Sequence, residues 1–425
     1  MNGFRDKNIV VVGMARSGIS AARFLRSCGA NVFITEKNIS KKLEDAANML
    51  KVEGIFVECG THSKGLIAKK DLVVLSPGVR MDSEPAQWAG ELGVELISEI
   101  ELAASVCPAP IIAITGTNGK TTTTTLVGEI IRASGRRAHV LGNIGTPFSS
   151  AVLDIKKEDY VSLETSSFQL EAIKKFKPKV AVILNLTPDH MDRYSTVEEY
   201  LGAKKRIFLN QDNSDCLVLN YSDPSLLNIA REARSRVEFF NKEPWEKEFN
   251  QNQMAVLAVA RVLNIDKKIC EEVFKNFKGV EHRMEFVREL NGIEFINDSK
   301  ATNIDSTIWA LNNIKKPAVL LAGGRDKGSD FAAIKELVKE KIKEVVVAGE
   351  ASERIFSAWS AILPVTKANT FPEAVSLAFQ KASSGEIVLF SPMCKSFDMF
   401  TDYEHRGRAF KELVQKLTPN LSHRP

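Results

Sequence analysis

One stretch of the chain, from Ile111 to Ile131, limits the available folds more than any other. The run from Ile111 to Ile114 is apolar and rich in branched residues, which predicts a buried strand. The segment that ends at Ile131 has apolar residues at helical spacing, which predicts a helix. A strand that enters a helix through glycines is suited to phosphate, because backbone N–H groups and the helix N-terminus point at the anion. The stretch therefore predicts an α/β fold with a phosphate-binding turn.

The turn is a shortened form of the pattern G-x-x-x-x-G-K-[ST], since Ile114 stands where the first glycine would be. We expect Lys120 to reach the outer phosphates of a nucleoside triphosphate and the Thr121 hydroxyl to ligate a magnesium ion. The residues expected to bind this nucleotide are Gly116, Thr117, Asn118, Gly119, Lys120, Thr121 and Thr122.

The strand–turn–helix arrangement occurs three times along the chain. One begins at Asn8, one at Ile111, and one follows the stretch "GVEHRMEFV" from Gly279 to Val287. Strands that alternate with helices favour parallel sheets covered on both faces. We expect three domains in series: a Rossmann-like domain over residues 1–107, a P-loop-type ATPase domain over 108–280 and a second Rossmann-like domain over 281–425.

Composition excludes several classes of protein. The chain has 425 residues and a formal charge of only +4, from 57 basic and 53 acidic residues, which does not favour a nucleic-acid partner. Its six cysteines form no C-x-x-C pair, which indicates reduced thiols rather than a zinc site or a disulfide framework. No signal peptide or membrane-length apolar run is present, so we expect a cytoplasmic protein without a membrane span.

The first glycine turn is degenerate. Gly13 and Gly18 fit G-x-G-x-x-G, but Ala15 replaces the middle glycine, and Glu36 ends the next strand at the distance expected for a ribose contact. A nicotinamide dehydrogenase would fit these residues, as would a second nucleotide that is bound rather than reacted. "SPG" closes the third strand, where it fits either this site or a plain β-turn. The residues expected to contact the second nucleotide are Arg16, Ser17, Glu36, Ser76 and Gly78.

Two strand ends in the middle domain carry candidate metal ligands. Glu164 ends one strand, and a second strand, expected from Val180 to Leu186, is followed by His190. Because the carboxyl ends of parallel strands share one edge, Glu164 and His190 are expected near Thr121. Because of this shared edge, we expect His190 to be a metal ligand rather than an ordinary polar residue with hydrogen-bond partners in the protein.

Lys204 falls within the apolar stripe of the helical segment "STVEEYLGAKKRIFLN", whereas Lys205 points about 100° away from it. A lysine on an apolar face can extend its ammonium to water. Alternatively its pKa falls, and the neutral amine reacts with electrophiles such as carbon dioxide. The residues alone leave both interpretations open.

The third domain has polar loops at three strand ends. Cationic and hydroxyl side chains there suit an amino-acid carboxylate or a nucleotide. These loops contribute Asp298, Lys300, Thr302, Asn303, Arg325, Lys327, Ser396 and Tyr403.

The longer motifs occur together in one known family. "TGTNGKT", "LETSSFQLE", "NLTPDHMDRY", "AKKRIF", "HR", "NDSKATN" and "KSFDMF" resemble the Mur ligases over essentially the whole chain. "SSFQLE", "DHMDRY" and "NDSKATN" are similar to the D-glutamate-adding members. The resemblance implies ATP-dependent joining of D-glutamate to UDP-N-acetylmuramoyl-L-alanine through an acyl phosphate and a tetrahedral intermediate, which yields ADP and phosphate in cytoplasmic peptidoglycan precursor synthesis.

The resemblance also implies roles for individual residues. Thr121 and Glu164 would hold one magnesium ion, while His190 and a carbamylated Lys204 would hold a second. Lys120 would contact the β- and γ-phosphates. The implied catalytic residues are Lys120, Glu164, His190 and Lys204. The implied ATP contacts outside the turn are Arg283, Asp298, Asn250 and Gln253, of which the last two lie where the family pattern H-N-x-x-N is altered. The implied contacts of the UDP-sugar are Asn143 and the first glycine turn, and those of D-glutamate are Thr302, Lys327, Ser396 and Tyr403. His190 and Lys300 are further implied substrate contacts.

Three alternatives remain at this point. A sister Mur ligase or a folylpolyglutamate-like ligase would use another amino acid, a dehydrogenase would bind a nicotinamide cofactor, and a non-catalytic nucleotide-binding module would not need the metal and lysine residues. We expect a monomer that acts on small molecules.

Overall fold

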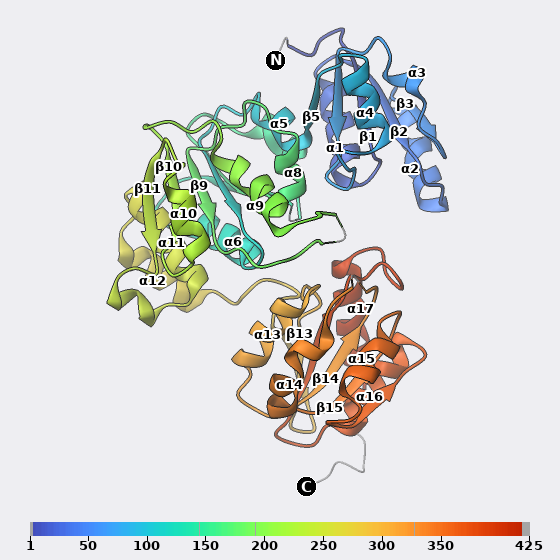
Figure 1. Ribbon diagram of the computed structural model, residues 1–425, viewed down its shortest axis with the longest axis vertical. Coiled ribbons are helices and arrows are strands. Elements are labelled where there is room, and N and C mark those ends of the chain that lie inside the picture. The colour runs from blue at the N-terminus through green and yellow to red at the C-terminus, as the bar shows by residue number, and fades with distance from the viewer. Residues whose placement is uncertain (1–2, 144, 192, 327, 419–425) are drawn as a thin grey trace. The chain divides into compact units, whose positions relative to one another are not determined.

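The computed structural model describes residues 3–143, 145–191, 193–326 and 328–418. The chain forms two compact units (Figure 1). One comprises Met1–Pro188 and Thr196–Phe277, and the other comprises Asp189–Ser195 and Lys278–Pro425. Three sheets, each with helices packed on it, confirm the predicted α/β fold. The predicted limits of three domains remain a prediction.

The N-terminal sheet of the first unit is entirely parallel, with the strand order β3-β2-β1-β4-β5. Its order reverses between β1 and β4, the position at which open α/β sheets bind ligands. The strands are β1 (Asn8–Val12), β2 (Asn31–Glu36), β3 (Phe56–Cys59), β4 (Leu72–Leu75) and β5 (Leu96–Ser98). The helices are α1 (Arg16–Ser27), α2 (Lys41–Val52), α3 (Lys64–Ile67), α4 (Glu84–Glu91) and α5 (Glu99–Ala104).

The second sheet of this unit is also parallel, with the order β11-β10-β9-β6-β8-β7. Its central strands are continuously apolar because helices cover both faces. The strands are β6 (Ile111–Thr115), β7 (Ala138–Gly142), β8 (Tyr160–Glu164), β9 (Val180–Ile183), β10 (Cys216–Asn220) and β11 (Arg236–Phe240). The helices are α6 (Lys120–Ala133), α7 (Phe148–Ala151), α8 (Ser167–Glu171), α9 (Val197–Lys205), α10 (Pro224–Ala230), α11 (Gln251–Leu263) and α12 (Lys267–Asn276), with 3₁₀ turns η1 (Val152–Asp154), η2 (Arg206–Phe208) and η3 (Pro244–Glu248).

One hydrophobic core joins these two sheets. It contains Val11 of β1, Leu102 of α5 and Leu163 of β8, all fully buried. The two sheets therefore belong to one compact unit although they carry separate glycine turns.

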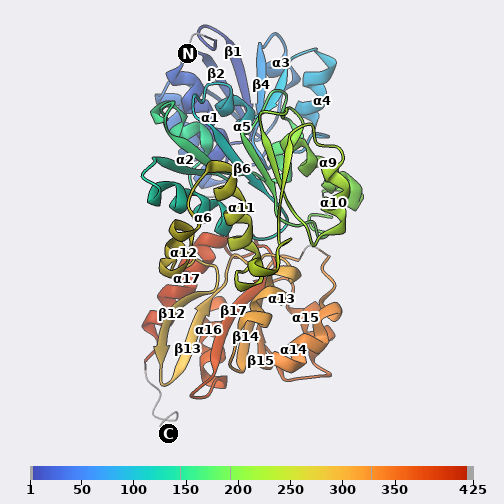
Figure 2. The same cartoon turned by 90° about the vertical axis from the view of Figure 1, so that its left-hand side faces the viewer.

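The sheet of the second unit is mixed, with the order β12-β13-β17-β14-β15-β16 (Figure 2). Only the edge pair β12 and β13 is antiparallel, so the prediction of mostly parallel sheets is confirmed. The strands are β12 (Glu285–Leu290), β13 (Ile293–Asn297), β14 (Ala318–Gly323), β15 (Ile342–Val347), β16 (Val365–Lys367) and β17 (Ile387–Met393). The helices are α13 (Ile304–Asn313), α14 (Lys335–Lys341), α15 (Ser352–Trp359), α16 (Phe371–Lys381) and α17 (Tyr403–Lys416), with the 3₁₀ turn η4 (Phe331–Ile334).

Two further expectations from composition bear on the whole chain. Its six cysteines are all free, as predicted, and burial raises the pKa of Cys270 to about 11. Among the described residues, no helix combines the length and the hydropathy needed to cross a membrane.

Candidate functional site: two glycine turns and a buried lysine

The central glycine turn joins β6 to α6. Gly116 and Gly119 have φ angles of +150° and +83°, and Gly119 is the N-cap of the helix. A Cβ at Gly119 would lie 2.3 Å from Asn252 Oδ1, so both conformation and space require glycine there. The shortened motif thus still forms the tight strand-to-helix turn that its spacing predicts.

The predicted metal ligands Thr121 and Glu164 lie together. Glu164 ends β8, which pairs with β6, and its side chain is 1% exposed. Thr121 Oγ1 donates to Glu164 Oε2 at 2.7 Å, while Asn143 Nδ2 donates to Oε1 at 2.9 Å. A hydroxyl and a carboxylate at a phosphate-binding turn are the oxygen donors that Mg²⁺ prefers, so this pair fits such an ion. The role of Asn143 as a substrate contact stays a prediction.

Lys120, half-buried, folds back over the turn. Its Nζ donates to the carbonyl oxygens of Gly116 at 2.9 Å and Thr117 at 2.8 Å. The ammonium therefore lies above the turn at the start of α6, where a phosphate contact is predicted for it.

Lys204 reaches the same turn from α9. It is 1% exposed, and its Nζ donates to Gly116 O at 2.9 Å and to Thr115 Oγ1 at 3.4 Å. The Tyr200 ring lies 4.6 Å from the ammonium. Lys205, by contrast, is half-exposed and pairs with Glu232. The amphipathic pattern therefore identified the buried lysine correctly, and its aliphatic stem does not carry the amine to the surface.

His190 belongs to the short segment Asp189–Ser195, which is part of the second compact unit. It has a φ of +58°, and its N–H donates to Asp189 Oδ1 at 2.8 Å. Asp189 Oδ2 in turn accepts from Asn303 Nδ2 at 2.9 Å. The proposed metal role of His190 therefore stays a prediction.

The N-terminal glycine turn lies at the β1–β4 reversal. Gly13 has a φ of +94°, its carbonyl accepts from Ser76 Oγ at 2.9 Å, and a Cβ at Gly18 would lie 1.9 Å from the same oxygen. Glu36 accepts from the N–H of Met14 through Oε2 at 2.9 Å. The other predicted contacts of this site, Arg16, Ser17 and Gly78, follow β1 or β4 and retain some exposure.

Glu36 also accepts from the backbone and side-chain nitrogens of Asn38, at 3.0 and 2.9 Å, through Oε1. Both carboxylate oxygens thus shape the turn. A contact from Glu36 to a ligand stays a prediction.

Asn250 and Gln253, which the altered family pattern suggests as contacts of the ATP base, form a reciprocal cap at the start of α11. Asn250 Oδ1 accepts from the N–H of Gln253 at 3.1 Å, and Gln253 Oε1 accepts from the N–H of Asn250 at 3.0 Å. Their oxygens are therefore directed at the backbone.

In the second unit the predicted loops follow β13, β14 and β17. Asp298 is fully buried, and Lys300 Nζ donates to Tyr403 OH at 3.0 Å. The Arg283 guanidinium lies 5.3 Å from the Trp309 ring. Ser396 is buried, Thr302 is half-buried, and Lys327 lies outside the described residues.

Comparisons with known proteins cover almost the whole chain. Three family models match: Mur ligase MurD-like N-terminal domain at residues 7–98, Mur ligase middle domain at 114–287, and Mur ligase glutamate ligase domain at 282–394. The chain is 42% identical to the UDP-N-acetylmuramoylalanine–D-glutamate ligase of Geotalea daltonii, over 97% of this chain and 98% of that one. The chain belongs to the Mur ligase family.

Solved structures agree in fold. MurC of Thermotoga maritima has a TM-score of 0.63 at 19% identity, covering 96% of this Mur ligase and 99% of that chain. MurF of Thermotoga maritima in complex with ADP has a TM-score of 0.60 at 17% identity, covering 97% and 96%. A further relative, from Koribacter versatilis, carries the same name as the Geotalea protein and is 39% identical over 97% of this chain and 98% of its own. The resemblance seen in the sequence motifs is thereby confirmed.

Two residues of this Mur ligase were missed by the sequence analysis. Asn185 Oδ1 accepts from the N–H groups of Thr117 and Asn118, at 3.1 and 2.9 Å, and its Nδ2 donates to Asn118 O, so it fixes the glycine turn. This contact corrects the predicted strand from Val180 to Leu186, because β9 ends at Ile183 and Asn185 has turned toward the phosphate-binding loop.

Arg406 is the second missed residue. It is 1% exposed and donates to Ser299 Oγ, Ser299 O and Cys394 O, so it ties the loop after β13 to the loop after β17. Its neighbourhood in "EHRGRAF" gave a helical pattern but no signal that this arginine is the buried one.

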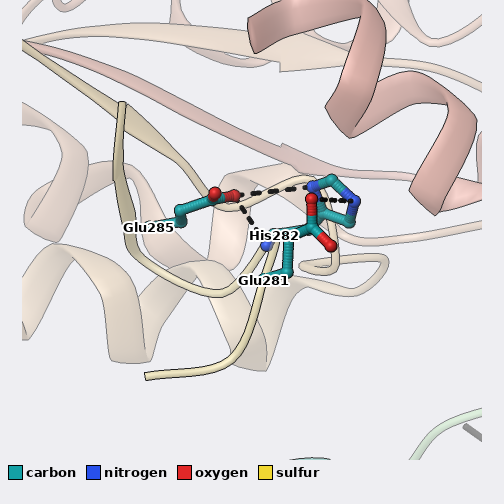
Figure 3. Close-up of side chains that lie close together, drawn as sticks. All are labelled: Glu281, His282 and Glu285. Atoms are coloured by element: carbon teal, nitrogen blue, oxygen red, sulfur yellow. Dashed lines mark hydrogen bonds and ion pairs between the residues drawn. The ribbon is translucent and has the colours of Figure 1, made fainter. Parts of the chain in front are cut away.

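Glu281, His282 and Glu285 have ligand atoms within 4.8 Å of one another (Figure 3). The Lys411 ammonium pairs with both carboxylates, at 2.9 Å from Glu281 Oε1 and 2.6 Å from Glu285 Oε1. His282 Nδ1 faces Asn297 Nδ2 at 2.9 Å, and burial lowers the pKa of His282. The two carboxylates of the cluster are therefore paired with Lys411, and its imidazole is held by Asn297.

Asp298 makes the stability of this Mur ligase depend on pH. Its carboxylate accepts from Ser391 Oγ at 2.8 Å and Met284 N at 3.3 Å, but burial raises its pKa from 3.8 to about 6. The folded state therefore holds the proton more tightly, so the contribution of Asp298 is most favourable below pH 4 and is lost as the pH rises through 6. A shift of about two units corresponds to about 3 kcal/mol.

We expect Asp298→Asn to remove the loss of stability that wild type shows as the pH rises through 6. The asparagine amide has no proton to lose in this range, and it can accept from Met284 N and donate to Ser391 Oγ. Urea unfolding at pH 4.5, 5.5 and 7 should show the stability of the variant rising relative to wild type by up to about 3 kcal/mol. If the difference in unfolding free energy between the variant and wild type were the same at all three pH values, the raised pKa of Asp298 would be contradicted.

Proposed function

We propose that the chain ligates D-glutamate to UDP-N-acetylmuramoyl-L-alanine at the expense of ATP, forming an amide, ADP and phosphate. The observation that carries the proposal is the correspondence, at 42% identity and over almost its full length, with a relative named for this substrate pair. Its wider role would be peptidoglycan precursor synthesis in the cytoplasm, by a monomer that needs neither a nucleic-acid nor a membrane partner.

The site chemistry supports phosphoryl transfer to a carboxylate. A carboxylate resists amines because oxide is a poor leaving group, and a phosphoryl group turns that oxygen into a good one. The protein then needs mainly to position the reactants and neutralise charge. Lys120 would leave the carbonyls of Gly116 and Thr117 to meet the β- and γ-phosphates, which offer its ammonium charged acceptors.

Thr121 and Glu164 would hold one Mg²⁺ ion, and His190 with a carbamylated Lys204 would hold a second. Such ions screen the phosphate charge and polarise the transferred phosphoryl group when bound. Asn143 supports the first position, since its amide already orients Glu164. The number of ions is part of the proposal.

The second step would occur with the residues of the second unit. The D-glutamate amine attacks the acyl carbon, a tetrahedral intermediate forms, the amine loses a proton, and phosphate leaves as the amide forms. Lys300, Thr302, Lys327, Ser396 and Tyr403 would hold the D-glutamate, and Arg283 and Asp298 would contact ATP. The Lys300–Tyr403 hydrogen bond supports a shared role for those two side chains.

The test is phosphate release from ATP and Mg²⁺ in the presence of UDP-N-acetylmuramoyl-L-alanine, with D-glutamate compared against L-glutamate, L-lysine, meso-diaminopimelate and L-alanine. We expect release with D-glutamate alone. Release with a different amino acid would replace the proposal with a sister or folylpolyglutamate-like ligase, and nicotinamide reduction without phosphate release would favour a dehydrogenase.

A further inference from the structure

A buried carboxylate, Glu99, connects the two substrate-bearing parts of the first unit and has no role in the chemistry proposed above. It lies in the first turn of α5 and is 1% exposed. Its Oε1 accepts from the N–H of Ser149 in α7 at 2.7 Å, and Oε2 has no hydrogen-bond partner among the residues that the structure describes. Burying a carboxylate with one oxygen unsatisfied is costly, which calls for a reason beyond packing.

Ser149 extends the connection to α1. Its Oγ lies 2.8 Å from Ser20 Oγ, and both serines are buried. Helix α1 begins at Arg16, directly after the N-terminal glycine turn. The chain Glu99–Ser149–Ser20 therefore joins α5, α7 and the helix that carries the predicted nucleotide contacts Arg16 and Ser17.

On its other side α7 follows the segment that contains Asn143. Asn143 is held at Glu164 through its backbone N–H, at 3.0 Å from Glu164 O, and through its side chain. Glu99 fastens the chain again at Ser149, six residues later in the sequence. The chain is thus held at Asn143 and again at Ser149.

Helix α7 packs against α1 beside a hollow that opens to the surface. The hollow has a volume of about 590 Å³ and is lined by Ile19 and Phe24 of α1 and by Pro147 and Leu153 beside α7, with Ser20 and Ser149 at its border. Phe148 of α7 and Ala21 of α1 are fully buried in one hydrophobic core, so apolar packing also holds the two helices together. The hydrogen bonds of Glu99 and Ser20 add directional constraints to that packing.

We propose that Glu99 is a positioning residue for the nucleotide-sugar substrate. Through Ser149 and Ser20 it fixes the position of the N-terminal glycine turn relative to the segment that bears Asn143. The proposal rests on the proposed function, because it assigns both elements to that substrate. Glu99 touches neither substrate nor the reacting atoms, and its effect is on binding geometry.

The position predicts a selective defect in Glu99→Ala. The KM for UDP-N-acetylmuramoyl-L-alanine, and its Kd by calorimetry without ATP, should rise about tenfold, as expected when one buried hydrogen bond that sets a binding geometry is lost. The KM values for ATP and D-glutamate and the kcat should stay within about twofold, since the Lys120 and Glu164 contacts do not involve α5.

Glu99→Gln should restore near-normal binding, because its Oε1 still accepts from Ser149 N. Burial raises the pKa of Glu99, so a neutral side chain also fits the site. Ser20→Ala, which removes only the hydroxyl link and should fold, is expected to raise the same Kd by a few-fold. Glu101→Gln is the matched control, because Glu101 lies on the same helix but accepts from the N–H groups of Lys174, Lys175 and Phe176. It should lower the melting temperature without a selective change in KM.

A Kd for the UDP-sugar that stays within twofold of wild type in both Glu99→Ala and Ser20→Ala would overturn the proposal. So would an equal rise in all three KM values, or the same selective defect in Glu101→Gln. The outcome is separable from that of the proposed function: if wild-type enzyme used another amino acid, D-glutamate ligation would fail, yet calorimetry with the UDP-sugar would still decide the role of Glu99.

Discussion

Replacing Lys204 with alanine is expected to lower kcat by about 10³-fold while the Kd for ATP changes by only a few-fold. The amine is buried, and its bonds to Gly116 O and Thr115 Oγ1 place it beside the phosphate-binding turn. A neutral amine adds to carbon dioxide to give a carbamate and a proton, and the carbamate would supply a metal ligand that alanine lacks. Losing one group that stabilises transition-state charge typically costs about 10²- to 10³-fold in rate.

Single-turnover kinetics and ATP calorimetry measure the two parts of this prediction. Lys205→Ala is the matched control, because its side chain is the next in the sequence but pairs with Glu232. Formate or acetate should restore part of the Lys204→Ala activity by occupying the place of the carbamate. Full activity in Lys204→Ala would refute the catalytic role, and loss without rescue would leave a lysine role but remove the carbamate.

Glu164→Gln should reduce kcat by about 10²-fold and raise the Mg²⁺ concentration needed for half-maximal rate. The amide keeps the size of the side chain but removes the negative charge that Mg²⁺ prefers, and its NH₂ would face either Thr121 or Asn143. Titrating Mg²⁺ at saturating ATP measures the shift.

Glu158→Gln serves as the control for this second variant, since Glu158 is exposed shortly before the same strand. A Glu164→Gln enzyme with a normal Mg²⁺ requirement and reduced kcat would assign Glu164 to orienting Thr121 and Asn143 instead. Unchanged kcat would remove Glu164 from the site.

The parts of this site that could be predicted are those in which local sequence dictates geometry. The glycine turn follows from a strand, two glycines and a helix in a fixed order, and Lys204 follows from a helical period. Glu164 was placed correctly because it ends a strand beside β6.

What could not be predicted depends on contacts between distant segments. Asn185 looked like the end of a strand, but it bonds to a turn 67 residues away in the sequence. Arg406 is buried 107 residues from its partner Ser299. Glu99 and Glu101 have nearly identical sequence surroundings and different partners, which only the packing of α5 against α7 and the loop at 174–176 distinguishes. Helical and strand periods carry no information on such pairings.

The reciprocal cap of Asn250 and Gln253 has a consequence for the choice of nucleotide. Each side-chain oxygen accepts from the other residue's backbone N–H and keeps one lone pair, while both NH₂ groups remain as donors. Such donors can bond to N7 of adenine or guanine, and guanine offers O6 as well. Selection of ATP over GTP would therefore depend on whether a remaining lone pair of these oxygens, or another acceptor, meets the adenine amino group, where guanine carries O6 instead.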